Sequence, residues 1–390
     1  MSIIEIKNIL LRAHLNHTPV VPVMALPLFC SKFPLKPLFT HSLPHPLKLS
    51  FGYTVASYST ILTPGLTCIG ESGGKYELVR PLGTQLPGYR ANTWVAVKDS
   101  EKKAEYVAKG PLLSKDGKDT TASAFMHEVE MQKLFKDDQM IRPMVDFVPS
   151  SEPGGPLMIL KPFEQTLWEA RNTRTFSVPE IKWIMKGVLL GLYTVHMKDL
   201  VYTDLKMENV GMQGFENDRP NENIRNLIVR LSDCGAISKP SQREVTSLTY
   251  RSPEIHFGKP WNQSCDIWSW GIILAQLFLA RVDFNKPGMY DNISAGSLEE
   301  KAKAIRDALA IDFDLHSVPY YAQDERISKL LPQPQPDTAY MWANSMFESG
   351  VAAEDIQFLA LVLQPDPNKR LVAAQILETG YLEESNSLCS

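Results

Sequence analysis

The stretch LVYTDLKMENV, residues 200–210, places an Asp, a Lys and an Asn close together: Asp204, Lys206 and Asn209. The segment IKWIMKGVLLGLYTVH (181–196), which comes before it, has apolar residues at helical spacing. The sequence therefore predicts a loop that follows a buried helix and carries a carboxylate, an ammonium group and an amide.

A second acidic residue follows another apolar run. Asp233, in the sequence SDCG, comes after LIVRL (227–231) and 29 residues beyond the first Asp. NVGM (209–212) and LIVRL are suited to two short strands between the two carboxylates. The polar insert QGFENDRPNENIRN (213–226) lengthens the connection between them. This position favours a metal-binding role for Asp233 over that of an ordinary turn residue.

Three later motifs make the pattern specific: TSLTYRSPE (246–254), CDIWSWG (265–271) and PDPNKR (365–370). With all of these in this order, the chain from about residue 76 to residue 381 resembles a eukaryotic protein kinase of the Ser/Thr type. The loop is similar to the family's H-R-D-L-x-x-x-N, SDCG to its D-F-G turn and SPE to its A-P-E. Tyr250-Arg251 before SPE is most similar to the CMGC group, with the SR-protein kinases nearest.

The resemblance implies an α+β fold with two lobes. A small β-rich N-lobe is expected at residues 76–163 and a larger α-helical C-lobe at 164–381, before a tail at 382–390. Residue patterning agrees with this order. The predicted strands are YELVRPL, TWVAVKD, AEYVAKG, MVDFV and LMIL, and the predicted helices are 125–135, 181–196, 266–280 and 354–363.

Two lysines compete for the phosphate-binding role that the resemblance implies. Lys98, in WVAVK, matches the family's V-A-I-K motif more closely. The family's Lys lies on the third strand, however, and LVRPLGTQLPGYRANTWVAV already supplies the first two strands. The prediction is therefore Lys109, in YVAK, with Lys98 a solvated residue in the next turn. Its acidic partner is expected on helix 125–135, where Glu128 is favoured and Glu130 is the alternative.

The resemblance also assigns roles to the other polar residues. Asp204 would accept the proton of the substrate hydroxyl, Lys206 would neutralise the transferring phosphate, and Asn209 and Asp233 would hold Mg²⁺. The Gly-rich loop is degenerate, because Ala91 stands at its third glycine position. Besides Lys109, ATP is expected to contact Gly83, Gly88, Leu160 and Phe163.

Three positions depart from the family pattern: Tyr202 replaces His, Thr203 replaces Arg and Cys234 replaces Phe. Tyr202 is expected to fill the space that the smaller Cys234 leaves, and its hydroxyl then needs a partner. The family's Arg grips a phosphorylated activation loop, which the neutral Thr203 cannot do. Ser247 is expected to bond Asp204.

The retained charged residues favour an active enzyme that does not need phosphorylation of the loop ending at Glu254, which is expected to pair with Arg370. One alternative is a pseudokinase that binds nucleotide or a partner without catalysis, supported by the same three departures. Another is a small-molecule phosphotransferase, which would lack segments like TYRSPE and the D-x-W helix.

Composition limits the partners and the compartment. The net charge of −4 over 390 residues predicts no nucleic-acid partner, and a protein substrate and ATP are expected instead. No apolar run reaches the length of a membrane span, and a monomer is assumed. The five cysteines are odd in number and lack a C-x-x-C pair, which favours a reduced intracellular protein of the cytoplasm or nucleus.

The N-terminal segment 1–69 differs from the rest. It has five Lys/Arg and a single acid, Glu5, and seven prolines fall between Pro19 and Pro46. This composition predicts a disordered segment or an organelle transit peptide, which would place the protein in the mitochondrion.

Overall fold

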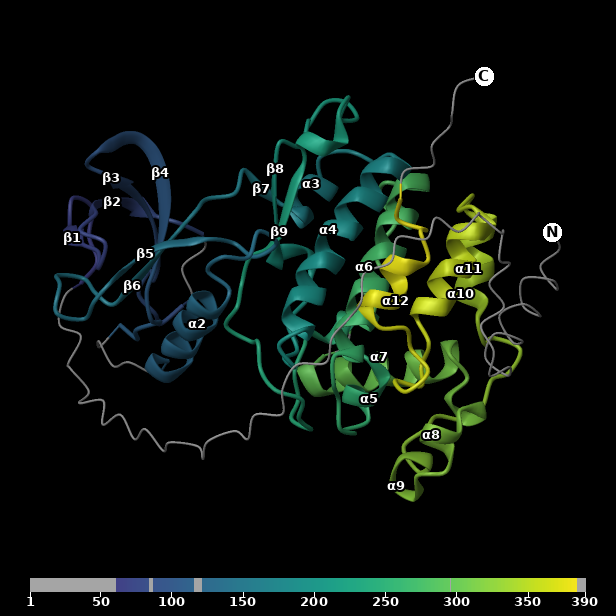
Figure 1. Ribbon diagram of the computed structural model, residues 1–390. Helices are drawn as coiled ribbons and strands as arrows, with labels where there is room; N and C mark the ends of the chain where they lie inside the picture. The colour runs from purple at the N-terminus through teal and green to yellow at the C-terminus, as the bar shows by residue number, and fades with distance from the viewer. Residues whose placement is uncertain (1–60, 84–86, 116–120, 295, 384–390) are drawn as a thin grey trace, which may run out of the picture.

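The computed structural model describes residues 61–83, 87–115, 121–294 and 296–383. Two lobes are evident in Figure 1: a sheet with one helix against it, and a larger helical body. The predicted α+β, two-lobed architecture is confirmed. Most of segment 1–69, the tip of the Gly-rich loop and most of the tail 382–390 lie outside the described residues.

The N-lobe is a six-stranded sheet with the order β1-β2-β3-β4-β6-β5. Its neighbouring strands are all antiparallel. The strands are β1 Thr67–Ile69, β2 Lys75–Pro81, β3 Thr93–Lys98, β4 Glu101–Lys109, β5 Met144–Val148 and β6 Leu157–Leu160, and helix α2 is Ala122–Leu134. The five strands predicted for this lobe all form, each within three residues of the expected bounds.

Strand β1 begins the N-lobe earlier than the sequence suggests. Thr67–Ile69 pairs with β2, with Cys68 opposite Tyr76. Both of these side chains are buried in one apolar cluster. The β-rich lobe therefore begins before residue 76, and β1 lies inside the segment assigned to the N-terminal region.

The C-lobe is built around two long helices. The helices of this lobe are α3 Leu167–Arg171, α4 Val178–His196, α5 Pro253–His256, α6 Ser264–Val282, α7 Leu298–Asp312, α8 Pro319–Ala322, α9 Glu325–Ser328, α10 Met341–Glu348, α11 Ala353–Val362 and α12 Ala373–Glu378. The indole of Trp270 on α6 donates to the carbonyl of Met185 on α4 at 2.9 Å. Helix α6 is long and apolar enough to cross a membrane by length and composition, but 89% of that window is buried inside the protein, as expected of a core helix.

A small sheet lies between the lobes and positions the site. Its order is β7-β8-β9, with β7 Gln165–Thr166, β8 Val210–Gln213 and β9 Ile228–Leu231. Strand β8 follows the 3-10 turn Met207–Asn209, and β9 leads to Asp233. The predicted pair of strands therefore brings the loop that contains Asp204 and the turn that contains Asp233 to the same edge of this sheet.

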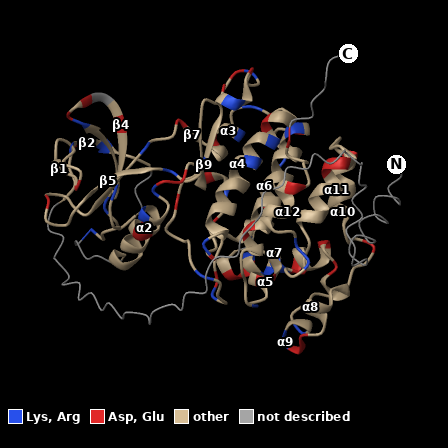
Figure 2. Ribbon diagram, viewed as in Figure 1, with Lys and Arg blue, Asp and Glu red and all other residues tan. Residues whose placement is uncertain are grey.

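Lys/Arg and Asp/Glu residues are interspersed along both lobes (Figure 2).

Candidate active site

The polar side chains of the loop 200–210 lie around Asp204. One carboxylate oxygen, Oδ2, accepts hydrogen bonds from Lys206 Nζ at 2.8 Å and from Asn209 Nδ2 at 2.9 Å. The other oxygen accepts from the hydroxyl of Ser247 at 3.3 Å. The expected Ser247 contact is therefore present. Asp204 remains 29% exposed, so a substrate hydroxyl can reach it.

The amide of Asn209 is oriented for a cation. Its nitrogen donates to Asp204 twice, to Oδ2 and to the main-chain carbonyl. The amide oxygen is thereby directed away from Asp204. Asp233, 42% exposed, presents a second oxygen ligand. Mg²⁺ is commonly held by one or two such oxygens, with phosphates and water completing the shell, and these two residues fit that pattern.

Among the described residues, no group of three or more His, Cys, Asp or Glu could hold a metal ion. A dedicated all-protein metal cage is therefore not found in this part of the chain. The Asn209 and Asp233 pair suits a metal that arrives with a phosphate ligand.

Lys109 lies at the end of β4 and joins the two lobes. Its Nζ is 2.7 Å from Glu128 Oε1 and 3.4 Å from Asp233 Oδ2. Burial opposes the charge on Lys109, but Asp233 and Glu128 outweigh it and raise the lysine pKa. Burial acts to raise the pKa of Asp233, but the Lys109 ammonium and the hydrogen bond from the Gly235 N–H outweigh burial and lower this pKa. The ammonium and this carboxylate are thus both held charged.

The competing residues lie elsewhere. Lys98 is the last residue of β3 and not, as predicted, a solvated residue of the next turn, because its backbone pairs with β4 and its ammonium lies 3.5 Å from Glu101. Glu130 is exposed, whereas Glu128 is only 6% exposed. Helix α2 is further fixed by His127, whose Nε2 lies 2.7 Å from the carbonyl of Ile237. The predicted pairing of Lys109 with Glu128 is therefore present, and Lys98 and Glu130 do not take part in it; that Lys109 binds phosphate stays a prediction.

Lys109→Ala is expected to lower kcat/KM by about 10²-fold or more, the range for removing one electrostatic donor to a transition state. Lys98→Ala, which removes a partly exposed surface pair, is expected to change it by less than about twofold. Steady-state phosphate transfer to a generic basic protein measures both. The opposite ranking would show that the strand assignment does not locate the phosphate site.

The expected nucleotide contacts lie around Lys109. The connection between β2 and β3 contains Gly83 and Gly88, with φ of 78° and 86°, in the region that favours glycine. The backbone after Gly88 is held by residue 115, whose N–H donates to the Gly88 carbonyl at 2.9 Å. Leu160 ends β6 opposite Val107 of β4, and Phe163 follows in the connection between the lobes.

Tyr202 occupies the core below the Asp233 turn. It is fully buried, as is Cys234. The Tyr202 hydroxyl accepts a hydrogen bond from the Asp233 N–H at 3.3 Å, so its predicted need for a partner is met. Gln132 of α2 donates to the Cys234 thiol at 3.4 Å. Burial, with Asp233 next to it, raises the pKa of Cys234, so the thiol stays protonated.

Thr203 organises the neighbouring loop through neutral hydrogen bonds. Its hydroxyl donates to the Ala236 carbonyl at 2.8 Å, and its own carbonyl accepts from the hydroxyl of Thr246. We call these two threonines and their bonds the threonine latch. Thr203 and Thr246 both have positive φ, 65° and 69°. Asp266 of α6 supports the latch by accepting from the Thr203 N–H at 2.8 Å.

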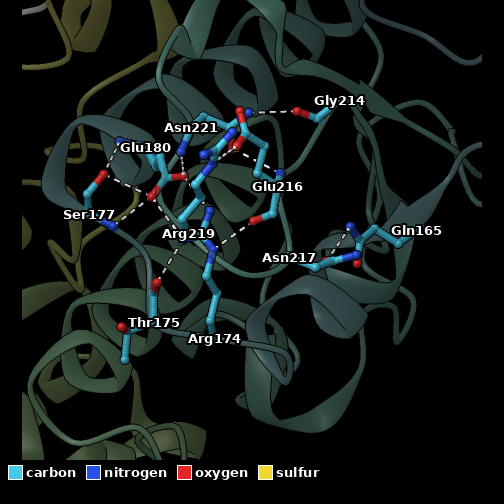
Figure 3. Close-up of polar contacts among 10 residues, drawn as sticks. All are labelled: Gln165, Arg174, Thr175, Ser177, Glu180, Gly214, Glu216, Asn217, Arg219 and Asn221. Carbon is cyan, nitrogen blue, oxygen red and sulfur yellow. Dashed lines mark hydrogen bonds and ion pairs between the residues drawn. The ribbon is translucent and has the colours of Figure 1, made fainter.

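The insert between β8 and β9 is attached to the start of α4 (Figure 3). Glu180, which is fully buried, binds Arg174 at 2.6 Å and accepts the Asn221 N–H at 2.9 Å. Asn221 in turn donates to the Gly214 carbonyl at 2.6 Å. The connection between β8 and β9 is therefore fixed to helix α4. These two strands lie next to Asn209 and Asp233 along the chain.

The segment that ends the activation loop is held by a buried ion pair. Glu254 binds Arg370 through two contacts, at 2.8 and 3.0 Å, and both side chains are fully buried. Arg370 also donates to the carbonyls of Gln364 and Ser264, at 2.7 and 2.8 Å. The predicted pairing of Glu254 with Arg370 is confirmed.

The fold and these contacts agree with a comparison against known families. A family model described as protein kinase domain matches residues 89–382, well over half of the chain. The chain belongs to the protein kinase family. The matched range begins directly after Gly88 and includes β3 and all later elements of both lobes, whereas β1, β2 and the two glycines of the Gly-rich loop precede it.

Several named relatives are similar to this kinase domain. Serine/threonine-protein kinase 33 of Bos taurus is 32% identical over 136 residues, which cover 32% of this chain and 28% of that protein. Mitogen-activated protein kinase p38b of Drosophila melanogaster is 24% identical, over 67% of this chain and 71% of the relative. Cell division control protein 2 homolog 2 of Trypanosoma brucei brucei is 27% identical, over 70% and 73%.

The fly and trypanosome relatives belong to the CMGC group, as the motifs predict. The kinase domain nevertheless spans less than a third of the bovine relative.

Three contributions to the site were not predicted from the sequence. Asp266 was part of a motif, but its bonds to the loop were not anticipated. Thr246 lies in the activation loop, and its hydroxyl has a structural role, because it donates to the Thr203 carbonyl. Arg142, whose Nε donates to the Lys161 carbonyl in the connection between the lobes, belongs to no motif, because it lies between α2 and β5 in a segment without periodic pattern.

Proposed function

We propose that this kinase domain is an active Ser/Thr protein kinase that transfers the γ-phosphate of ATP to a protein hydroxyl, with Mg²⁺ as its metal. The observation that carries the proposal is the joined set of Lys109, Glu128 and Asp233, with ion-pair distances of 2.7 and 3.4 Å. A kinase fold that has lost catalysis has no need to keep these three charged side chains in contact across its two lobes.

Each retained residue has a specific task in this proposal. Asp204 orients the substrate hydroxyl and accepts its proton as the oxygen attacks phosphorus. Lys206, which binds Asp204 at 2.8 Å, would offset charge on the transferring phosphoryl group. Lys109 holds the non-transferring phosphates. Mg²⁺, held by Asn209 and Asp233, would neutralise phosphate oxygens and fix their orientation.

A phosphate-transfer assay with radiolabelled ATP and a generic basic protein tests this function. The intact chain is expected to label the protein, and Asp204→Asn is expected to remove most of the labelling. A chain that binds nucleotide but labels nothing, under any divalent metal, would support the pseudokinase alternative. Labelling of small alcohols but not of protein would instead indicate a small-molecule phosphotransferase.

We also propose that activity does not depend on phosphorylation of the activation loop. Support comes from the threonine latch, which is neutral, and from the pair of Glu254 and Arg370, which is present at all times. The cations nearest to the loop are Lys239, Arg243 and Arg251. Lys239 is exposed on the loop itself, and Arg243, which donates to Ser238 at 3.0 Å, also belongs to the loop, so neither offers a fixed anchor; Arg251 already donates to the Thr246 carbonyl. A phosphate orders a loop only where a fixed cation can receive it.

Phosphatase treatment of the bacterially produced enzyme, and replacement of Ser238 and Ser241 together by Ala, are each expected to change the rate less than threefold, about 0.6 kcal/mol. Thr246 is left intact, because its hydroxyl belongs to the latch and its backbone is left-handed. A tenfold loss after phosphatase treatment, restored by an upstream kinase, would show that the loop is switched by phosphate.

The compartment is a separate proposal. We infer an intracellular protein of the cytoplasm or nucleus, because the cysteines within the described residues, Cys68, Cys234 and Cys265, are free and buried. Subcellular fractionation with N-terminal sequencing of the mature protein tests this. A shortened N-terminus in the mitochondrial fraction would support the transit-peptide interpretation of residues 1–69.

A further inference from the structure

A cavity of about 420 Å³ lies in the C-lobe beside the loop 200–210. Three parts of this lobe line it: helix α3, the loop 200–210 together with the end of the activation loop, and the segment that follows α6. The lining includes Arg171, Glu208, Thr249, Phe284, Lys286 and Asp291.

The cavity is within reach of a peptide whose hydroxyl meets Asp204. Thr249, in the cavity wall, comes two residues after Ser247, and the Ser247 hydroxyl donates to Asp204. Two residues of chain span at most about 7 Å, and an extended substrate covers the same length in two residues. A side chain two to five residues away from the target hydroxyl can therefore enter this cavity.

Arg171 is a buried cation that forms no ion pair with the described residues. It is 7% exposed. Its terminal nitrogens donate to the side-chain oxygen of Asn172 at 3.3 Å and to the Lys286 carbonyl at 2.9 Å, and within the described part of the chain its Nε has no partner. These two neutral acceptors use two of the five N–H groups of an arginine. Arg370, which is also buried, instead binds the Glu254 carboxylate at 2.8 and 3.0 Å.

The acidic residues of the cavity do not offset the charge of Arg171. Asp291 is exposed, and its Oδ2 already accepts from the Gly288 N–H at 2.9 Å and from Gln276 at 3.3 Å. Glu208 is exposed as well, so water solvates its carboxylate. Burial lowers the pKa of Arg171, although Asp291 acts to raise it. The surroundings thus disfavour the charged guanidinium, and an anion in the cavity would relieve this.

A second cation and an aromatic ring complete the donor side of the cavity. Lys286 lines the same space, and its carbonyl is the group that receives Arg171, so the two cationic residues are neighbours in the wall. The Arg171 guanidinium carbon lies 5.4 Å from the centre of the Phe284 ring, within cation–π range. A planar guanidinium next to an ammonium is an arrangement that binds phosphate and carboxylate groups.

We propose that this cavity binds an acidic or phosphorylated side chain of the protein substrate, two to five residues from the hydroxyl that receives phosphate, and that Arg171 and Lys286 hold its anionic group. The proposal rests on the proposed function, because it requires a substrate peptide at Asp204. It concerns the ratio of rates between substrates, so labelling of a generic basic protein is compatible with it.

The test uses synthetic peptides with one acceptor serine in an alanine background. Each position from five before to five after the serine carries phosphoserine, Glu, Ala or Arg in turn. At one or more of these positions, the full chain is expected to phosphorylate the phosphoserine peptide with a kcat/KM about tenfold to a hundredfold above that of the alanine peptide, the range for hydrogen bonds to a charged group. An equal gain with Glu identifies an acidic substrate, and a gain with phosphoserine alone identifies a phosphorylated one.

Two variants assign the preference to the cavity. Arg171→Met keeps an unbranched side chain but removes every donor, and is expected to bring the ratio of phosphoserine to alanine peptide within about threefold of one. Lys286→Met is expected to lower the ratio about threefold to tenfold. Arg281→Met, an exposed residue at the end of α6 and outside the cavity lining, is the matched control and should leave the ratio unchanged. Each ratio compares two peptides on one preparation, so a smaller folded fraction does not alter it.

Three results overturn the inference while the kinase stands. One is a ratio within threefold at every position. Another is a preference for Arg at these positions, which would assign the cavity to Glu208. The third is an anionic preference that both Arg171→Met and Lys286→Met leave unchanged. If no peptide is phosphorylated at all, the proposed function fails and the inference falls with it.

Discussion

Asp204→Asn is expected to lower turnover by about 10²–10⁴-fold, the range for loss of a positioned proton acceptor. The carboxylate receives Lys206, Asn209 and Ser247 at 2.8, 2.9 and 3.3 Å, so its orientation is fixed before substrate arrives. Nucleotide affinity should be nearly unchanged, because the residue faces the hydroxyl rather than the phosphates. Steady-state kinetics and a nucleotide titration of the same preparation measure the two effects.

Asp233→Asn is the matched comparison. Asp233 lies 3.4 Å from Lys109 and is placed to hold the metal, so its loss should weaken Mg²⁺-dependent nucleotide binding as well as turnover. Titrations with and without Mg²⁺ separate the two variants. Full activity in both would contradict the enzyme proposal, and equal losses of affinity in both would contradict the separate roles.

Arg370→Met is expected to lower the free energy of unfolding by about 3–5 kcal/mol, the cost of leaving one partner of a buried ion pair uncompensated. Glu254 would be left without its cationic partner and with no exposure to water. Three main-chain carbonyls, those of Ser264, Gln364 and Pro365, would also lose a donor. Urea unfolding followed by circular dichroism measures the change.

Lys75→Met is the control for this prediction. Lys75 pairs with Asp99 at 3.1 Å, but the two side chains are 54% and 51% exposed. Exposed pairs contribute about 0–1 kcal/mol. A similar loss of stability in both variants would mean that the charge itself, rather than its burial, determines the cost.

The sequence alone was enough to predict those contacts whose geometry follows from the order of the strands and the spacing of the residues. Lys109 could be chosen over Lys98 because a hairpin requires two strands before the third, and β2, β3 and β4 follow that order. Glu128 could be chosen because it lies 19 residues after Lys109 and among apolar residues of its helix, Phe125 and Val129. The pair of Glu254 and Arg370 was predicted from motif resemblance across more than a hundred residues.

Features that depend on tertiary contacts could not be predicted in this way. The bond between Arg142 and the Lys161 carbonyl joins two segments without periodicity. In the sequence, nothing distinguishes Gly211 from an ordinary strand residue, because the Phe163 ring that excludes a larger side chain there comes from a distant segment. The sequence shows that Thr203 lacks a charge. The hydrogen bond from the Thr246 hydroxyl to the Thr203 carbonyl could not be predicted, because it depends on left-handed backbone at both residues.

The threonine latch also has a consequence for the solution conditions in which the loop stays ordered. A clamp of phosphate and arginine is an attraction between ions, and dissolved salt weakens it over the Debye length, about 8 Å at physiological ionic strength. The bonds of Thr203 to Ala236 and Thr246 join neutral groups. Dissolved ions have little charge to screen in them, so the order of this loop is set by geometry and is largely independent of ionic strength.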